Sequence, residues 1–499
     1  MSRIPAMLLA VLVCGPLTAA EPVNIGSQLE LMIDDHMVGS TRGDIRLQMH
    51  RPVRRNIALF TDNKWEGNAC TYTSVFQDGD RYRMYFGSLH YVMAKGKLIQ
   101  GHRPHTCYAE SRDGIHWTKP RLGLVDFEGS TQNNIVLAEG TIKEIPVDPA
   151  HIAVFKDSNP KCPSDERYKA IIRSRQKKGL FALKSSDGLH FSPLSTQLIL
   201  TDGAFDSENL AFWDSARGEY RAYFRDFRDG IRGIKTATSK DFLKWSKSEW
   251  LVFPGSPHEH LYTNQISPYA RAPHILFGFP MRYIDRGHVD STAKLPHPEL
   301  RLLRTKASPR YGSAVTDGLM MTSRNGVTFK RWGEAILRPG PSRTNSWVYG
   351  DNIIAWGLLS TPSDLPEAPR ELSLFATEGY WAGKGMNLRR YSIRTDGFVS
   401  MQATLSGGEF VTRPLIFSGD RLAINYSTSA AGGVWVEIQD AEGKPITGFA
   451  RADCHEVFGD EIERAVTWMD SETVSRLASR PVRLRFVLKD ADLFSFRFR

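Results

Sequence analysis

Cysteine is scarce in this sequence. The 499 residues contain five cysteines, and no two of them form a CxxC pair. This spacing predicts neither a structural zinc site nor a dense disulfide framework. One disulfide among Cys70, Cys107, Cys162 and Cys454 is an alternative, but buried thiols are the simpler interpretation. We therefore expect the fold to be held together by burial of apolar side chains rather than by cross-links.

Long hydrophobic runs are also missing. The apolar stretch Met7–Val13 follows one arginine and precedes small residues that end at Ala20, a pattern typical of a secretory signal peptide. Cleavage after Ala20 is expected; lipoprotein processing at Cys14 is disfavoured, because Val13 stands where a small residue is needed. No later stretch approaches the roughly 18 apolar residues that span a bilayer. The sequence therefore predicts a secreted or periplasmic protein whose signal peptide covers residues 1–20.

Neither sign of charge dominates strongly. Lys and Arg number 64 against 55 Asp and Glu, a net charge of +9 that removal of Arg3 lowers by one. Spread over a large surface, this balance favours an anionic over a cationic substrate. The basic residues are scattered and form no known nucleic-acid-binding motif, so we expect no nucleic-acid partner. The sequence does not predict an oligomeric state.

One short phrase recurs along the chain at intervals of about 50 to 80 residues. Its copies are SRDGIHW (111–117), SSDGLHF (185–191), SKDFLKW (239–245), SRNGVTF (323–329) and, more loosely, IRTDGFV (393–399). We expect the glycine to form a turn between outer strands and the aromatic residue to fill the gap between neighbouring sheets. A structural role is therefore favoured over a ligand-binding role.

Short β-strands are predicted between these phrases. Aromatic or β-branched runs bounded by polar turns lie at 82–88, 167–174, 219–226 and 274–280. A repeated four-stranded antiparallel unit at this spacing favours a β-propeller over a solenoid. The predicted fold class is all-β: a five-bladed propeller over residues 21–403 and a C-terminal β-sandwich over 404–499. The second domain is interpreted as a stabilising appendage, with carbohydrate binding as the alternative.

Carboxylates and aromatic residues recur just before, or early in, the first strand of each predicted blade. Those positions converge on one pocket at the axis of a propeller. Two carboxyl groups, one protonated and one ionised, can cleave a glycosidic bond, and aromatic rings cover sugar faces. The candidate catalytic residues are Glu66, Asp148, Asp206 and Glu208. The candidate substrate-binding residues are Trp65, Asn68, Glu259, His260, Tyr262, Asn264, Arg271, His274, Trp347 and Asp351.

Two of these stretches also carry a family resemblance. With FDSENLAFWD (205–214), LYTNQISPYARAPHILFGFP (261–280), the recurring phrase and the trailing β-rich segment, the chain resembles five-bladed propeller glycosidases of glycoside hydrolase families 32 and 43. It is most similar to secreted planctomycete family-32-like proteins. The resemblance implies a base or nucleophile at Glu66, a supporting acid at Asp148 and a general acid at Glu208, with Asp206 as the rival of Glu208.

The sequence departs from that family pattern in ways that affect the substrate. The WMNDPNG signature is missing, and Val147-Asp148-Pro149 stands where Arg-Asp-Pro is usual. Fructan or arabinoxylan substrates are therefore not implied, although an anionic carbohydrate fits the net charge. We expect a secreted glycoside hydrolase without a membrane span or cofactor; a structural calcium ion is compatible with the sequence, but no pattern indicates one. The alternatives are a non-catalytic glycan-binding protein and a polysaccharide lyase with a Tyr or His base near His260 and Tyr262.

Overall fold

The computed structural model describes residues 21–469, 471 and 473–499, so the predicted signal peptide lies outside it. The chain is all-β with a few short helices, and it divides into two compact units. The larger unit contains residues 31–34 and 47–400; the smaller contains 21–30, 35–46 and 401–499. The first domain expected from the sequence, residues 21–403, includes 21–30, 35–46 and 401–403, which belong to the smaller unit. Among the described residues, no helix is both long enough and apolar enough to span a membrane.

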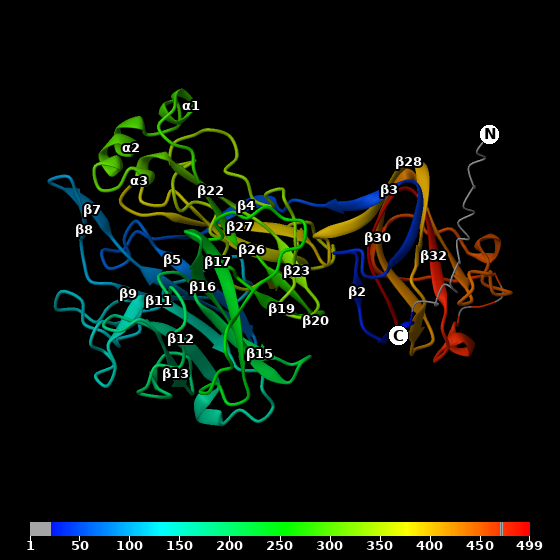
Figure 1. The fold of residues 1–499 in the computed structure, drawn as a ribbon, viewed down its shortest axis with the longest axis horizontal. Coiled ribbons are helices and arrows are strands. Elements are labelled where there is room, and N and C mark those ends of the chain that lie inside the picture. Colours follow the sequence, from blue (N-terminus) through cyan, green and yellow to red (C-terminus); the bar gives the residue numbers. More distant parts are fainter. Residues whose placement is uncertain (1–20, 470, 472) are drawn as a thin grey trace, which may run out of the picture. The chain divides into compact units, whose positions relative to one another are not determined.

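Five four-stranded antiparallel sheets make up the core of the larger unit (Figure 1). Sheet 1 contains β5 (Thr71–Asp78), β6 (Arg81–Ser88), β9 (His105–Ser111) and β10 (Ile135–Ala138). Sheet 2 contains β11 (Val147–Lys156), β12 (Tyr168–Ser174), β13 (Leu180–Ser185) and β14 (Ser192–Pro193). Sheet 3 contains β15 (Leu210–Asp214), β16 (Glu219–Arg228), β17 (Ile231–Ser239) and β18 (Glu249–Trp250). Sheet 4 contains β19 (Ser267–Tyr269), β20 (Ala272–Gly278), β23 (Met321–Ser323) and β24 (Lys330–Arg331).

Sheet 5 joins the two ends of the larger unit. It contains β25 (Leu359–Thr361), β26 (Glu371–Glu378) and β27 (Asn387–Arg394), and its fourth strand is β4 (Val53–Phe60). The antiparallel pairing of β27 with β4 puts Leu388 opposite Leu59 and Tyr391 opposite Arg54. The chain therefore begins and ends this unit in the same sheet. The four strands predicted at 82–88, 167–174, 219–226 and 274–280 are confirmed as β6, β12, β16 and β20, each second in its sheet.

The recurring phrase forms the turn after the third strand of each sheet, as predicted. In the first copy, the Ser111 hydroxyl and the Asp113 carboxylate accept hydrogen bonds from the backbone N–H groups of the turn, at 2.8 Å for Gly114, Ile115 and His116. Gly114 has a φ of 75°, which favours glycine. The same bonds recur around Asp187, Asp241 and Asn325. The phrase is therefore a side-chain-capped turn, repeated because the sheets repeat.

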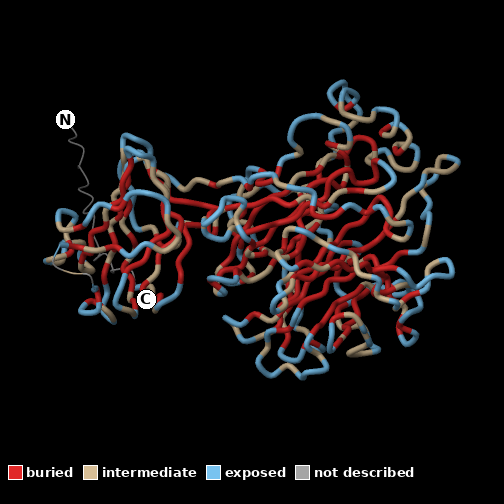
Figure 2. Tube along the Cα trace, turned by 180° about the vertical axis from the view of Figure 1, so that it is seen from behind, coloured by how far each residue is buried: buried red, intermediate tan, exposed pale blue. Residues whose placement is uncertain are grey.

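Each of these turns also contacts a neighbouring sheet. Such contacts link sheets 1 and 2, 2 and 3, 3 and 4, 4 and 5, and finally 5 and 1. The residues are Tyr85 with Gly188, Phe155 with Phe242, Tyr223 with Gly326, Tyr269 with Asp396, and Phe375 with Trp117. The succession of contacts returns to the sheet in which it began. Buried residues follow the strands, and exposed ones the loops (Figure 2).

Hairpins and short helices are inserted between the sheet strands of the larger unit. The hairpin of β7 (Tyr91–Ala94) and β8 (Lys97–Gln100) follows β6, and the short helix η1 (Ser164–Glu166) precedes β12. A second hairpin, β21 (Met281–Asp285) with β22 (Ala314–Gly318), lies between β20 and β23. Three short helices connect its strands: α1 (Asp290–Ala293), α2 (Pro298–Thr305) and α3 (Arg310–Ser313). This insertion matters for the site because α3 begins with Arg310, which lines the cavity described below.

The smaller unit is a sheet with unusually long strands. Its strand order is β3 (Val38–Met49), β28 (Val399–Thr412), β32 (Arg483–Phe498), β30 (Leu422–Gln439) and β31 (Asp460–Ala465), and β2 (Glu30–Leu31) pairs with β32. A parallel pair, β1 (Val23–Gly26) with β29 (Leu415–Phe417), and the helices η2 (Arg451–Asp453) and η3 (Ser475–Leu477) complete it. The register shifts between Ala403 and Gly408 and between Thr428 and Gly433. Such bulges bend long strands.

The described cysteines are all free thiols. Cys70, Cys107 and Cys454 are buried, and Cys162 is half-buried. Burial raises the pKa of the Cys70 thiol to about 12 and that of Cys454 to about 11. These thiols stay protonated at neutral pH.

Candidate functional site

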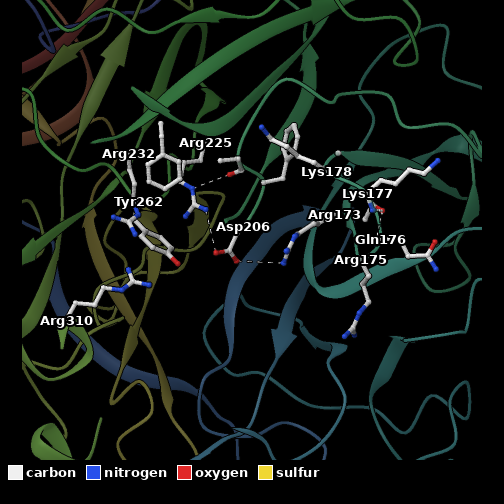
Figure 3. A pocket seen from close by; sticks show the side chains of 15 residues that line it. Arg173, Arg175, Gln176, Lys177, Lys178, Asp206, Arg225, Arg232, Tyr262 and Arg310 are labelled. Atoms are coloured by element: carbon white, nitrogen blue, oxygen red, sulfur yellow. Dashed lines mark hydrogen bonds and ion pairs between the residues drawn. The ribbon is translucent and has the colours of Figure 1, made fainter. Parts of the chain in front are cut away.

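A cavity of about 580 Å³ opens on the larger unit where strands of sheets 2 and 3 meet the inserted hairpin (Figure 3). The loop between β12 and β13, the segment before β15, the hairpin of β16 and β17, and α3 all contribute to its wall. The lining residues used below are Arg173, Arg175, Lys177, Lys178, Asp206, Arg225, Arg232, Tyr262 and Arg310. Figure 3 shows Asp206 between Arg225 and Arg173, with Tyr262, Arg232 and Arg310 to one side.

An irregularity in β11 brings two site residues together. The register between β11 and β12 jumps from Val147 opposite Ser174 to Ile152 opposite Ile172. The extra residues on β11 bulge, so strict alternation of side chains between the two faces is broken there. Asp148 and His151 both lie in this bulge. Asp148 is one of the predicted catalytic residues; His151 was not predicted.

His151 lies between two carboxylates. Its Nδ1 is 3.0 Å from Asp148 Oδ2, which is an ion-pair contact but not a hydrogen bond. Its Nε2 is 3.3 Å from Asp206 Oδ1. Burial alone would lower the pKa of His151, but the two carboxylates outweigh it and raise the pKa. Arg173 Nη1 lies 3.1 Å from Asp148 Oδ2. Against the opposing effect of burial, His151 and Arg173 lower the pKa of Asp148. The group is thus one charged network with Asp206 at its open end.

Asp206 is the carboxylate that meets the cavity. Its side chain is 66% exposed, whereas Asp148 and His151 beneath it are nearly buried. Burial of part of the group works against ionisation, but His151, Arg225 and Arg173 lower its pKa to about 2. Asp206 is therefore ionised throughout the physiological range and serves as an acceptor, base or nucleophile rather than as a proton donor.

Tyr262 forms the aromatic wall of the cavity. Its ring carries the guanidinium of Arg225 at 5.1 Å and that of Arg232 at 5.4 Å, both measured to the ring centroid. Tyr349 packs edge-on against it at 6.4 Å. Tyr262 was predicted to bind substrate, and the structure brings it to the same cavity as Asp206.

Tyr72, which was not among the predicted site residues, lies beside the charged network. Its ring packs on His151 with centroids 5.0 Å apart. Its φ of 55° is rare for an aromatic residue, and it falls in a bulge where β5 shifts register against β6 between Thr71 and Ser74. Such strained residues cluster at functional sites. Burial, then the neighbouring Tyr262 and Asp206, raise the pKa of Tyr72, so its phenol stays protonated.

Glu208 lies beneath the surface, two residues beyond Asp206. It is 1% exposed, and its Oε2 accepts a 2.6 Å hydrogen bond from Gln265 Nε2. Its Oε1 is buried and has no hydrogen-bond partner among the described residues. Burial raises the pKa of Glu208 well above its usual value, and the bond from Gln265 only partly opposes this. Glu208 is thus a buried carboxyl group that favours the protonated form, two residues along the chain from the ionised Asp206.

Glu66 does not line the cavity. It is fully buried, and its Oε2 receives hydrogen bonds from Lys119 Nζ at 2.7 Å and from the Asn63 backbone N–H at 3.0 Å. Its neighbour Trp65 donates its indole N–H to Asn134 Oδ1 at 2.6 Å. Asn68 is held by the backbone, donating to Tyr91 O and Gly383 O and accepting from Tyr91 N. All three predicted site residues of this stretch make local structural contacts.

Most predicted residues around sheet 4 are also structural. Glu259 pairs with Arg331, and Asn264 is 1% exposed, with its Oδ1 accepting from Ile266 N. Arg271 pairs with Asp396 at 3.0 Å, and the His274 carbonyl accepts from Arg217. His260 lies next to the cavity, where its Nδ1 accepts from the backbone N–H of Arg232 at 3.1 Å.

Trp347 and Asp351 lie elsewhere. Trp347 lines a second cavity of about 510 Å³ together with Arg282, Asp317 and Arg338, and its indole N–H donates to the Gly340 carbonyl. Asp351 is 4% exposed, accepts from the Tyr380 backbone N–H at 3.0 Å, and has a pKa raised by burial to about 7. Of the predicted residues, Asp206 and Tyr262 line the cavity, Asp148 is linked to Asp206 through His151, and His260 bonds to the backbone of Arg232, whereas Glu208 does not line the cavity.

Five arginines line the cavity, and all escaped prediction because none precedes a first strand; Arg175 lies in the loop after β12. Arg173 and Arg225 lie near the far ends of the second strands β12 and β16, in IIRS and YFRD; Arg232 follows the β16–β17 turn, and Arg310 lies in the insertion. The only available signal was the arginine near the end of two equivalent strands. Among the described residues, no cluster of three or more His, Cys, Asp or Glu side chains has the geometry of a metal site.

No known protein-family model matches the chain, and no curated protein sequence matches it. Its structural neighbours include glycoside hydrolases. A Bacteroides thetaiotaomicron endo-arabinase shares 10% identity, with a TM-score of 0.40 over 68% of this chain and 98% of the enzyme. A protein described as a glycoside hydrolase shares 12% identity, with a TM-score of 0.43 over 70% of this chain and 93% of that one.

Another neighbour carries out a different reaction on sugars. An N-acetylgalactosamine deacetylase from F. plautii, determined with blood group B trisaccharide, shares 11% identity and a TM-score of 0.41. The similarity covers 69% of this chain and 94% of the deacetylase. All three likenesses are distant.

Proposed function

We propose that the protein is a glycoside hydrolase whose active site is the cavity at Asp206. We further propose that the five sheets form a five-bladed propeller and that the smaller unit is a β-sandwich. The shared fifth sheet and the closed succession of turn contacts support the ring. In such a ring the segments before the first strands of sheets 2 and 3 supply the acids.

One observation carries the proposed chemistry: two carboxyl groups that are two residues apart in the sequence have pKa values displaced in opposite directions. Asp206 is held ionised with a pKa of about 2, whereas burial raises the pKa of Glu208. Such a divergence is how a site assigns one carboxyl group as proton donor and another as base or nucleophile. Glu208 donates a proton to the leaving-group oxygen, while Asp206 acts on the anomeric carbon directly or through water.

The other groups position this pair. His151 bridges Asp148 to Asp206 and orients the reactive carboxylate. Tyr262 offers a ring face to the sugar. Glu208 is buried and accepts a hydrogen bond from Gln265, so the mechanism requires the Gln265 side chain to move away from Glu208 when the substrate binds. The base position implied at Glu66 passes to Asp206 in this proposal.

A lyase is the second candidate, favoured by the surroundings of Tyr72. A strained tyrosine lies on His151, and Arg225 and Arg232 flank Tyr262 nearby. Elimination from a uronic acid needs a base beside a carboxylate whose charge is neutralised; Arg225 and Arg232 would neutralise the carboxylate, and the ionised Asp206 would act as the base. The product would be an unsaturated sugar that absorbs ultraviolet light.

A panel of polysaccharides and oligosaccharides tests the proposal. We expect the purified protein to release reducing sugar from at least one member, and Asp206→Asn and Glu208→Gln each to reduce the rate by about 100-fold or more. Asp80→Asn, a change to an exposed carboxylate paired with Arg112, is the matched control and should retain full activity.

Three results contradict hydrolysis by this pair. If both variants release as much sugar as the wild type, Asp206 and Glu208 are not the catalytic residues. An ultraviolet-absorbing product favours the lyase instead. Saturable binding to a glycan with no product after long incubation indicates a binding protein.

A further inference from the structure

The cavity carries a large excess of positive charge. Seven cationic side chains line it, against the single carboxylate of Asp206. Three of the seven are already paired: Arg173 with Asp148, Arg175 with Glu139 at 3.0 Å, and Arg225 with Asp206 at 3.7 Å. The other four, Lys177, Lys178, Arg232 and Arg310, form no ion pair with any carboxylate among the described residues.

Arg232 is held in place without a counter-ion. Its guanidinium lies over the rings of Tyr283, Phe227 and Tyr262, at 5.0, 5.3 and 5.4 Å from their centroids. Its Nε is buried and has no hydrogen-bond partner in the described part of the chain. Burial and Arg232 lower the pKa of the neighbouring His260, which favours its neutral form, so His260 is not a counter-ion for Arg232. The aromatic rings fix the guanidinium; its Nη1 lies 3.4 Å from His260 Nδ1, whereas its Nε has no acceptor among the described residues.

Arg310 repeats this arrangement from the inserted hairpin. Its guanidinium lies 4.9 Å from the ring centroid of Tyr311, and its Nη1 is buried without a partner among the described groups. Leaving a buried charged donor unsatisfied is costly, and two such donors at one cavity are unusual. A ligand that brings its own oxyanion would satisfy both, since the planar guanidinium matches carboxylate and sulfate oxygens.

We propose that Arg232 and Arg310 bind a carboxylate or sulfate substituent of the substrate, so that the protein acts on an acidic glycan. This inference rests on the proposed function, because it takes the cavity to be the saccharide site. The ionised Asp206 repels an anion, whereas Arg232 and Arg310 lie on the far side of Tyr262 from it (Figure 3). The anionic group is therefore bound there, and the uncharged glycosidic linkage is left beside Asp206. Lys177 and Lys178, exposed on the β12–β13 loop, attract further acidic units of the chain.

Binding measurements separate this inference from the cleavage reaction. Calorimetric titration of the full protein with short oligosaccharides of polygalacturonate, alginate, chondroitin sulfate and carrageenan covers both sources of negative charge. Each is compared with its methyl-esterified or desulfated counterpart. We expect at least one acidic oligosaccharide to bind about tenfold or more tightly than its uncharged form, with affinity falling as salt rises. Uronate and sulfate probes show which oxyanion is recognised.

Variants locate the binding. Arg232→Gln and Arg310→Gln should each weaken binding of the acidic probe by about tenfold and leave the uncharged probe unchanged. Arg232→Lys and Arg310→Lys keep the positive charge and should lose less affinity for the acidic probe than the glutamine variants. They also control for misfolding caused by loss of the charge. Arg286→Gln, a change to an exposed arginine outside the cavity lining, is the control and should bind as the wild type does.

The outcomes distinguish the two proposals. If all uncharged forms bind as well as the acidic ones, if no acidic probe binds, or if both glutamine variants retain wild-type affinity, acidic specificity is overturned. Cleavage of an uncharged glycan would then still support the hydrolase. Conversely, arginine-dependent binding of an acidic oligosaccharide that is never cleaved supports the anion site and rejects the hydrolytic function.

Discussion

Glu66→Gln tests whether this residue is structural or catalytic. Removing one partner of a buried ion pair costs about 3–5 kcal/mol. Glu66 is fully buried, but Lys119 keeps Asp62 at 2.8 Å, and the glutamine oxygen can still accept from the Asn63 N–H. We therefore expect a loss at or just below the bottom of that range, about 2–3 kcal/mol of unfolding free energy. Urea denaturation followed by tryptophan fluorescence measures it, with Trp65 as a neighbouring reporter.

A double variant provides the control. Adding Lys119→Met to Glu66→Gln removes the cation that has lost its buried carboxylate partner, so it should recover at least half of the lost stability. Turnover per folded molecule should change by less than about tenfold in the single variant, because Glu66 does not reach the cavity. Wild-type stability combined with a loss of turnover of about 100-fold or more would refute this reasoning and return Glu66 to the catalytic site.

Two further predictions concern stability. Burial raises the folded-state pKa of Asp351 to about 7, above the usual value of an aspartate. The folded protein therefore holds a proton that the unfolded chain releases, and stability should fall between about pH 4 and 7 by up to about 1.4 kcal/mol per unit. Asp351→Asn should flatten that slope in urea denaturation at several pH values, and an unchanged slope would contradict the assignment. Asp187→Ala removes the acceptor of the Leu189 and His190 N–H groups in a repeated turn and should cost about 1–2 kcal/mol, whereas Ser186→Ala next to it should cost little. Equal melting temperatures for these two variants would show that the turn bonds do not stabilise the fold.

The sequence by itself determined the turns and strands that depend on residues close together in the chain. In the first four copies of the repeated phrase, the aspartate or asparagine caps a turn through bonds to near neighbours, so the sequence pattern alone locates these turns. The strands at β6, β12, β16 and β20 follow from aromatic and β-branched runs between polar turns. Asp148, Asp206 and Tyr262 were found for a related reason: each immediately precedes a first strand or lies early in one.

Only the tertiary structure decided which acids share a cavity. Glu66 and Asp206 look alike in sequence, each beside a strand start, but Lys119, far along the chain, pairs with the first and leaves it buried. The arginines of the cavity come from second and third strands, from the loop after β12 and from an insertion, and His151 reaches the site through a bulge in β11. The pairing of β4 with β27 likewise joins residues more than 300 positions apart. A sequence records short-range preferences, whereas partners chosen by burial and charge across such separations exist only once the chain has folded.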